Sequence, residues 1–228
     1  MSGRGWAGAG FLLTIALICW VGTEGAIRAD VPKWTVKPVE AAIPKSVSAS
    51  IQAVLSPAAL EVQDETGKPV ATLWRRKELP LQQKGANSYA ALAEGMLIGL
   101  IQWHQPWTDY RKQKVKPGVY TLRFARQPMD GDHMGTAPYN EFLLLVPAAL
   151  DEKPDTLMVD ELHELSGKTV GRKHPSMMLL FPYRKGNSDA ATLTARPQDH
   201  LTLDFVIPVG GGGTLGFALT VVGHTMAE

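Results

Sequence analysis

The sequence predicts a mainly-β fold, a β-sandwich with one or two short helices. Short segments that alternate apolar and polar residues recur along the chain, as in strands with one buried face. Glycine and proline, 22 and 16 of the 228 residues, separate these segments and favour tight turns. Helical spacing of apolar residues is scarce. Several short strands joined by such turns are typical of a sandwich.

Two pairs of alternating segments predict hairpins. Leu60–Gln63 and Val70–Trp74 lie on either side of a turn that contains Gly67. Leu201–Ile207 and Leu215–Val222 flank a run of four glycines in the same way. A glycine between two alternating runs favours a hairpin because it accepts the backbone conformations that tight turns need.

Two further segments predict central strands. Gly118–Arg126 alternates, with Tyr120, Leu122 and Phe124 on one face and residues such as Arg123 on the other. Phe142–Val146 is continuously apolar, which indicates a strand that is covered on both faces.

Helix is expected in two places. Leu157–Leu165 has apolar residues at helical spacings, and Gly167 is a plausible C-terminal stop for this helix. Ser88–Leu100 combines alanines with a β-type apolar run, so we expect a helical turn followed by a strand.

The N-terminal residues have the three-part order of a signal peptide. Arg4 supplies a positive charge, an apolar run follows from Phe11 to Val21, and a polar stretch leads to a cleavage site after Ala29. The apolar run is shorter than the roughly 20 residues that a membrane-spanning helix needs. We therefore expect residues 1–29 to be removed on export, and the protein to act in the periplasm or outside the cell.

Two other interpretations of this leader stay open. The leader could be retained as an N-terminal membrane anchor, or Cys19 could be lipidated, although Ile18 stands where a lipobox has a small residue. After the leader, residues 30–45 are expected to be an extended N-terminal arm because prolines punctuate them. Residues 46–228 are long enough for one sizeable core and are expected to form a single β-sandwich domain.

Charge and cysteine content exclude several partners and chemistries. The formal net charge is +1, and the chain without its leader carries equal numbers of basic and acidic residues. Nucleic acid is therefore not an expected partner, since a basic surface would be needed. The only cysteine, Cys19, leaves with the leader. The mature chain then has no disulfide, no thiolate nucleophile and no cysteine metal ligand.

Three sequence blocks carry a family resemblance. DYRKQKVKPGVYTLRF, GDHMGTAPYNEF and LSGKTVGRKHPSMMLLFP resemble blocks in a family of uncharacterised exported bacterial proteins. KPGVYTL is also similar to the turn and strand of secreted immunoglobulin-like modules. The resemblance covers the second half of the chain and implies an immunoglobulin-like or related sandwich in an exported protein. It implies no activity, cofactor or site residue.

The sequence matches known enzyme motifs only in part, and no catalytic residues are predicted. GGGTLG (211–216) fits a dinucleotide-binding pattern, but a strand-like run follows it where a helix should open. SGKT (166–169) resembles the end of a phosphate-binding loop, but Leu162 stands at the required glycine. No nucleophile-elbow motif is present, and His163-Glu164 lacks the second histidine of a zinc-protease motif. A hydrolase with a dispersed site is the least favoured alternative.

Two segments are candidate ligand sites. Aromatic rings beside hydrogen-bonding groups suit a sugar or another flat ligand, and loops between strands commonly carry binding residues. The alternative is that the tryptophans fill the core and that the loop is an ordinary turn. The candidate ligand-binding residues are Trp103, His104, Trp107, Asp109, Tyr110, Asp130, Asp132 and His133. Their shared site requires that segments 103–110 and 130–139 converge in the fold.

Copper is the one cofactor that the sequence suggests. Histidines stand close to methionines, and imidazole with thioether is a ligand set that suits Cu(I). Methionine is also a common core filler, so packing is the competing interpretation. The candidate copper ligands are His133, Met134, His174 and Met177.

These observations favour an exported, non-enzymatic module that binds a small molecule, a glycan or a protein. A periplasmic copper-binding protein is the alternative. Contact with a membrane is expected only through an uncleaved leader.

Overall fold

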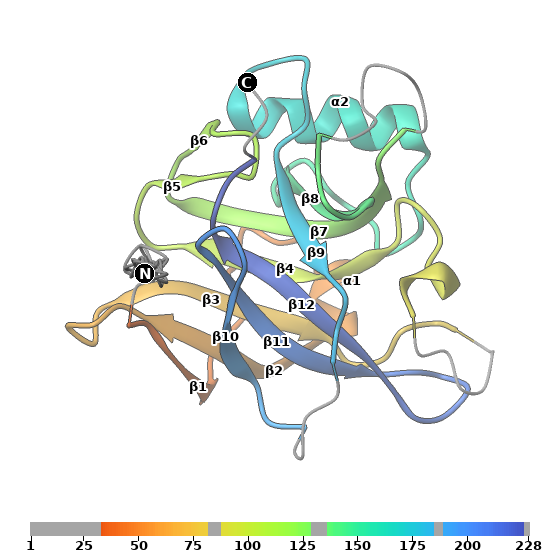
Figure 1. Cartoon of the computed structure of the whole chain (residues 1–228). Coiled ribbons are helices and arrows are strands. Elements are labelled where there is room, and N and C mark those ends of the chain that lie inside the picture. Colours follow the sequence, from red (N-terminus) through yellow and green to blue (C-terminus); the bar gives the residue numbers. More distant parts are fainter. Residues whose placement is uncertain (1–32, 82–87, 129–135, 185–188, 226–228) are drawn as a thin grey trace, which may run out of the picture.

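One large antiparallel sheet dominates the structure (Figure 1). The structure is a computed structural model, and it describes residues 33–81, 88–128, 136–184 and 189–225. The ten strands of the sheet are β1 (Thr35–Glu40), β2 (Leu55–Gln63), β3 (Pro69–Arg76), β4 (Leu97–Trp103), β7 (Gly118–Arg126), β8 (Glu141–Pro147), β9 (Met177–Phe181), β10 (Thr192–Arg196), β11 (His200–Pro208) and β12 (Thr214–Val222).

Smaller elements complete the described chain. β5 (Trp107–Thr108) and β6 (Lys114–Val115) form a separate two-stranded hairpin. The α-helices are α1 (Ala49–Val54) and α2 (Val159–Val170), and one turn of 3₁₀ helix spans Tyr89–Ala91.

The sheet folds over on itself. Its strand order is β1-β2-β3-β4-β7-β8-β9-β12-β11-β10, and the two outer strands, β1 and β10, approach each other without a ladder between them. In Figure 1 the end made by β10, β11 and β12 lies across β2 and β3. One continuous sheet thus supplies both layers of a nearly closed, sandwich-like fold. The prediction of a mainly-β fold with one or two short helices is confirmed.

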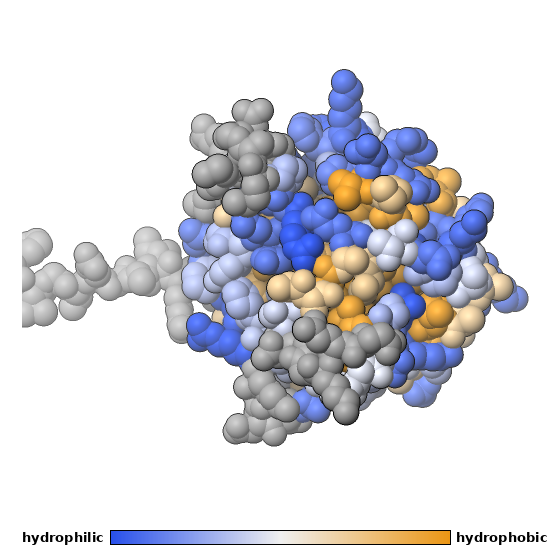
Figure 2. All heavy atoms as spheres, turned by 90° about the vertical axis from the view of Figure 1, so that its right-hand side faces the viewer, coloured by the Kyte–Doolittle hydropathy of each residue, from blue (hydrophilic) through white to orange (hydrophobic). Residues whose placement is uncertain are grey.

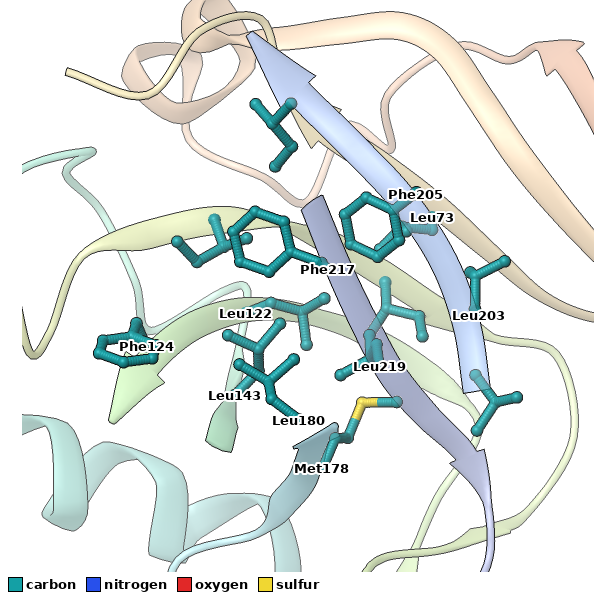
Figure 3. Close-up of a cluster of buried hydrophobic side chains, with 14 of the residues drawn as sticks. Leu73, Leu122, Phe124, Leu143, Met178, Leu180, Leu203, Phe205, Phe217 and Leu219 are labelled. Carbon is teal, nitrogen blue, oxygen red and sulfur yellow. The ribbon is translucent and has the colours of Figure 1, made fainter. Parts of the chain in front are cut away.

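Side chains fill the space inside the folded sheet. Alternate residues of each strand point inward because successive side chains leave a strand on opposite faces. Phe205 and Phe217 stack there with ring centroids 5.4 Å apart. Figure 3 shows the inward side chains meeting one another: Leu73, Leu122, Phe124, Leu143, Met178, Leu180, Leu203, Phe205, Phe217 and Leu219.

The two helices cover parts of the outer face. Leu162 of α2 lies in a second apolar cluster with Phe142, Leu144 and Leu179, and α2 lies over β8 in Figure 1. Ile51 of α1 belongs to a third cluster on another part of the sheet. β8 is therefore buried on both faces, as its continuous apolar sequence predicted.

The expected helix over Leu157–Leu165 exists, but its expected stop at Gly167 is wrong. α2 continues to Val170 and ends at Gly171, which has a left-handed φ of 66°. Gly167 lies inside α2, where a Cβ would stand 2.4 Å from the carbonyl oxygen of Arg172. The chain folds back closely after α2. Gly167 is therefore needed for close packing, and Gly171 ends the helix.

Of the expectations for the N-terminal residues, the structure bears on the extended arm and not on the signal peptide. Part of the segment expected as an arm, residues 30–45, is extended but forms β1, which pairs with β2 at the edge of the sheet. Residues 1–29 lie outside the described residues, so the signal peptide stays a prediction. In the described ranges no helix is both long enough and apolar enough to span a membrane.

A buried ion pair holds the long connection from β8 to α2 against β7. Arg123 and Asp151 are both inaccessible to solvent, and the guanidinium donates two hydrogen bonds of 2.7 Å to the carboxylate. The remaining N–H groups of Arg123 donate to carbonyl oxygens of Gly95, Lys153 and Asp155. All five donors of the guanidinium therefore have acceptors.

Removing one partner of this pair should be costly. Arg123→Leu leaves the Asp151 carboxylate buried without its counter-charge, so the free energy of unfolding should fall by about 3–5 kcal/mol. Urea unfolding followed by tryptophan fluorescence measures this loss. Lys37→Leu is the matched control, because the Lys37–Glu61 pair is largely exposed at Lys37 and should contribute about 1 kcal/mol or less. A similarly small loss for Arg123→Leu would contradict a structural role for the buried pair.

Candidate functional site

A cavity of about 500 Å³ lies between α2 and the outer face of the sheet. Its apolar lining comes from β7, β8, the start of β9 and the segment before β8. These apolar residues are Ala125, Ala137, Phe142, Leu144 and Met177. Volumes of this size are typical of small-molecule sites. The cavity is therefore the candidate site of this structure.

Side-chain hydrogen bonds fix α2 on one side of the cavity. The Ser166 hydroxyl donates to the carbonyl oxygen of Ser176 and accepts from its backbone N–H. Thr169 donates to the carbonyl oxygen of Leu145 on β8, at 2.7 Å. Because α2 is fixed to the strand and to the segment before β9, the cavity exists before any ligand enters.

A tight turn between β5 and β6, residues 109–113, forms another wall and is called the Asp109 turn below. The Asp109 carboxylate is fully buried and accepts from the backbone N–H groups of Arg111 (3.0 Å), Gln113 (2.8 Å) and Met177 (3.3 Å). The Gln113 side chain donates to the same carboxylate at 3.0 Å. Asp109 thus fixes the turn and joins it to β9.

The C-terminal segment holds the Asp109 turn from another side. The N–H of Thr225 donates to the carbonyl oxygen of Tyr110 at 2.8 Å. Nδ1 of His224 lies 3.1 Å from the carbonyl oxygen of Asp109. Within the turn, Lys112 has a left-handed φ of 63°. The surrounding contacts impose this conformation, which residues other than glycine rarely adopt.

Among the described residues, the charged side chains that line the cavity are all basic. Arg111, Lys112 and Lys173 are exposed and line it together with the imidazoles of His163 and His174. No Asp or Glu belongs to the lining that the described residues form. Arg126 also lines the cavity, but its guanidinium donates to backbone carbonyls of the 3₁₀ turn and the residue after it.

The tryptophans of the predicted aromatic cluster lie in the core. Trp103 and Trp107 are 1% and 8% exposed and stack with ring centroids 4.4 Å apart. Nε1 of Trp107 donates to the carbonyl oxygen of Val221. His104 is exposed, and its Nε2 lies 2.8 Å from the Thr72 hydroxyl. Of this segment, Tyr110 lines the cavity and Asp109 supports the turn behind it.

The second predicted segment is described only in part. Asp130, Asp132, His133 and Met134 lie outside the described residues, so their roles stay predictions. Thr136 lines the cavity together with Tyr110. Thr225 bridges the two segments, because it donates its N–H to the carbonyl oxygen of Tyr110 and its hydroxyl to the carbonyl oxygen of Thr136. The end of the first segment, Tyr110, therefore meets the described part of the second segment at this cavity.

Of the candidate copper ligands, His174 and Met177 both line the cavity, and His163 lines it as well. Among the described residues, no three His, Cys, Asp or Glu side chains gather in a metal-binding group. The sequence interpretation missed Arg111, Lys112 and Lys173. These cations come from a turn and from the connection after α2, and no motif in the sequence links the two.

The Asp109 carboxylate should leave a signature in the pH dependence of stability. Burial raises the pKa of Asp109 above its ordinary value of 3.8, although its hydrogen bonds oppose the shift. A raised folded-state pKa means that stability is lost as pH rises from 3.8 through the folded-state pKa. Relative to Asp109→Asn, the wild type should therefore lose free energy of unfolding over this range and then level off.

Urea unfolding of both proteins between about pH 3 and about pH 7 measures the difference. Asp64→Asn is the control, because a hydrogen bond from Thr66 lowers the pKa of Asp64 and predicts the opposite slope. If the free energy of unfolding of the wild type increased with pH relative to that of Asp109→Asn, a raised pKa of Asp109 would be contradicted.

Comparisons of the chain with protein-family models, with curated proteins and with solved structures found no match. Any function must therefore be argued from the cavity and its lining.

Proposed function

We propose that the protein is an exported, non-enzymatic binding module that holds a small, largely apolar molecule in the cavity beside α2. The observation that carries this proposal is the position of the cavity. The interior of the folded sheet is filled by side chains, whereas about 500 Å³ stays open outside it, over an apolar floor. Export is supported by the order of charged, apolar and polar residues in the leader.

The fixed walls favour binding over a purely structural role. α2 is bonded to β8 and to the segment before β9, and the Asp109 turn is bonded to β9 and to the C-terminal segment. A preformed cavity binds without ordering its own walls, which lowers the entropic cost of binding. Trp103 and Trp107, the rings that the sequence offers for stacking on a glycan, are buried in the core, and the floor of the cavity is apolar, so a small apolar molecule is the partner we propose.

A neutral fluorescent probe tests the proposal. N-phenyl-1-naphthylamine fluoresces more strongly in apolar surroundings, so the wild type should give saturable binding at one site. Ala137→Trp places a large ring at a lining position and should weaken binding by about tenfold or more. Ala149→Trp is the control, because Ala149 is exposed and does not line the cavity. No saturable binding, or equal binding by all three proteins, would refute the proposal.

Copper binding is the second candidate function. It is favoured by one observation, that two imidazoles and a thioether, from His163, His174 and Met177, line the same cavity. This is a ligand set that suits Cu(I). The four cations in the same lining, Arg111, Lys112, Arg126 and Lys173, oppose it, because like charge lowers the affinity for a metal ion.

A competition titration distinguishes the two functions. If copper is the ligand, the wild type should withdraw Cu(I) from bicinchoninate, and the double change His163→Ala and His174→Ala should abolish this competition. His104→Ala, at an exposed histidine outside the cavity, should compete as the wild type does. Equal competition by wild type and double variant, or none by either, would exclude copper at this cavity.

A further inference from the structure

We propose that the ligand is an apolar acid, a molecule with a hydrocarbon or aromatic body and one anionic group that Arg111, Lys112 and Lys173 bind. This inference rests on the proposed function and adds the charge of the ligand to it. The apolar floor of the cavity takes the body, and the cations in its lining take the carboxylate or an equivalent anion.

The first support is a set of cations without counter-charges. Arg111, Lys112 and Lys173 make no ion pair and no side-chain hydrogen bond with any described residue, and in the described ranges no carboxylate lines the cavity with them. The chain as a whole is almost neutral. The positive charge at the cavity is therefore a local feature, and it complements an anion.

The second support is the backbone of the Asp109 turn. Lys112 holds a left-handed φ of 63°, a conformation that glycine adopts at lower cost. The buried Asp109 carboxylate and the C-terminal segment keep the turn in this shape. A fixed turn places two adjacent cations in the lining without further ordering of the backbone, which favours binding of a small anion.

The C-terminus of α2 already has a basic residue of its own. Basic side chains in the last turn of a helix are favoured because the helix C-terminus carries partial negative charge. Lys168 fills this role and also pairs with Glu164, at 3.0 Å. Arg111 and Lys112 belong to the Asp109 turn and not to α2, whereas Lys173 follows shortly after the C-terminus of the helix.

Two probes with the same aromatic body test the charge of the ligand. 8-Anilinonaphthalene-1-sulfonate is N-phenyl-1-naphthylamine with an added sulfonate. We expect the wild type to bind the sulfonate about tenfold more tightly than the neutral probe. Added salt should weaken binding of the sulfonate and leave the neutral probe unaffected. Fluorescence titration measures both, and near-ultraviolet circular dichroism checks that each protein stays folded.

Charge-neutralising variants locate the effect. The double change Arg111→Gln and Lys112→Gln should remove the tenfold preference for the sulfonate and change binding of the neutral probe by less than about twofold. Lys114→Gln is the matched control, because Lys114 follows closely in the sequence, bonds to Thr108 and does not line the cavity. It should bind both probes as the wild type does.

A glycine variant separates binding from structure. Lys112→Gly removes a cation and relieves the left-handed backbone, so it should unfold at a temperature no lower than the wild type. It should nevertheless bind the sulfonate more weakly. A variant that loses stability together with sulfonate binding would mean that Lys112 is structural, and would overturn its part in the proposal.

A chain-matched series extends the test to a natural type of acid. Decanoate should displace the neutral probe at lower concentration than 1-decanol, and decylammonium should be the weakest competitor. If the neutral probe binds but the anions show no advantage, the proposed function stands and the inference about charge is wrong. If no probe binds in the cavity, the proposed function itself is wrong.

Discussion

The buried ion pair between Arg123 and Asp151 is the interaction on which the arrangement of this protein depends. Two charges removed from water are stable only when each finds its full set of partners, and here the carboxylate and three backbone carbonyls use every donor of the guanidinium. All of these partners except Gly95 lie in the connection that leads to α2. The pair therefore fixes the path from which α2 begins, and α2 in turn forms one side of the cavity.

Beside this pair, the backbone at Gly95 leaves no room for a side chain. Gly95 has a φ of 82°, and a Cβ there would stand 1.9 Å from the carbonyl oxygen of Leu157. The start of β4, the ion pair and the entry to α2 thus meet at one close contact. Figure 2 shows one face of the molecule, on which apolar patches lie among hydrophilic surface. The cavity beside α2 combines an apolar floor with a bias toward positive charge.

The strands could be predicted because each depends on neighbours in the sequence. Alternation in Gly118–Arg126 predicts that Tyr120, Leu122 and Phe124 share one face, and the structure shows that this face points inward. Alternation gave no sign that Arg123, on the other face, is buried, because burial there comes from a connection almost thirty residues later. Local patterns predict which residues share a face, and they do not predict what covers it.

The candidate site was less accessible to prediction for the same reason. The close spacing of aromatic and polar groups in the sequence favours Trp103 and Asp109 as ligand-binding residues. The fold uses Trp103 in the interior core and Asp109 to hold a turn. Arg111 and Lys173 become neighbours of one cavity only through the packing of α2 on the sheet. Such long-range proximity has no signature in a single sequence.

The strand order has a consequence for how the chain reaches its native state. Most neighbouring strands follow one another in the sequence, but β9 pairs with β12, the last strand. A chain that emerges N-terminus first, from the ribosome or through a membrane, can therefore form its early hairpins while one side of β9 has no partner. Phe217 and Leu219 reach the interior only when β12 arrives. Cooperative folding must wait for this C-terminal strand, and a chain that lacks it would expose both the open edge of β9 and the apolar side chains that β12 covers.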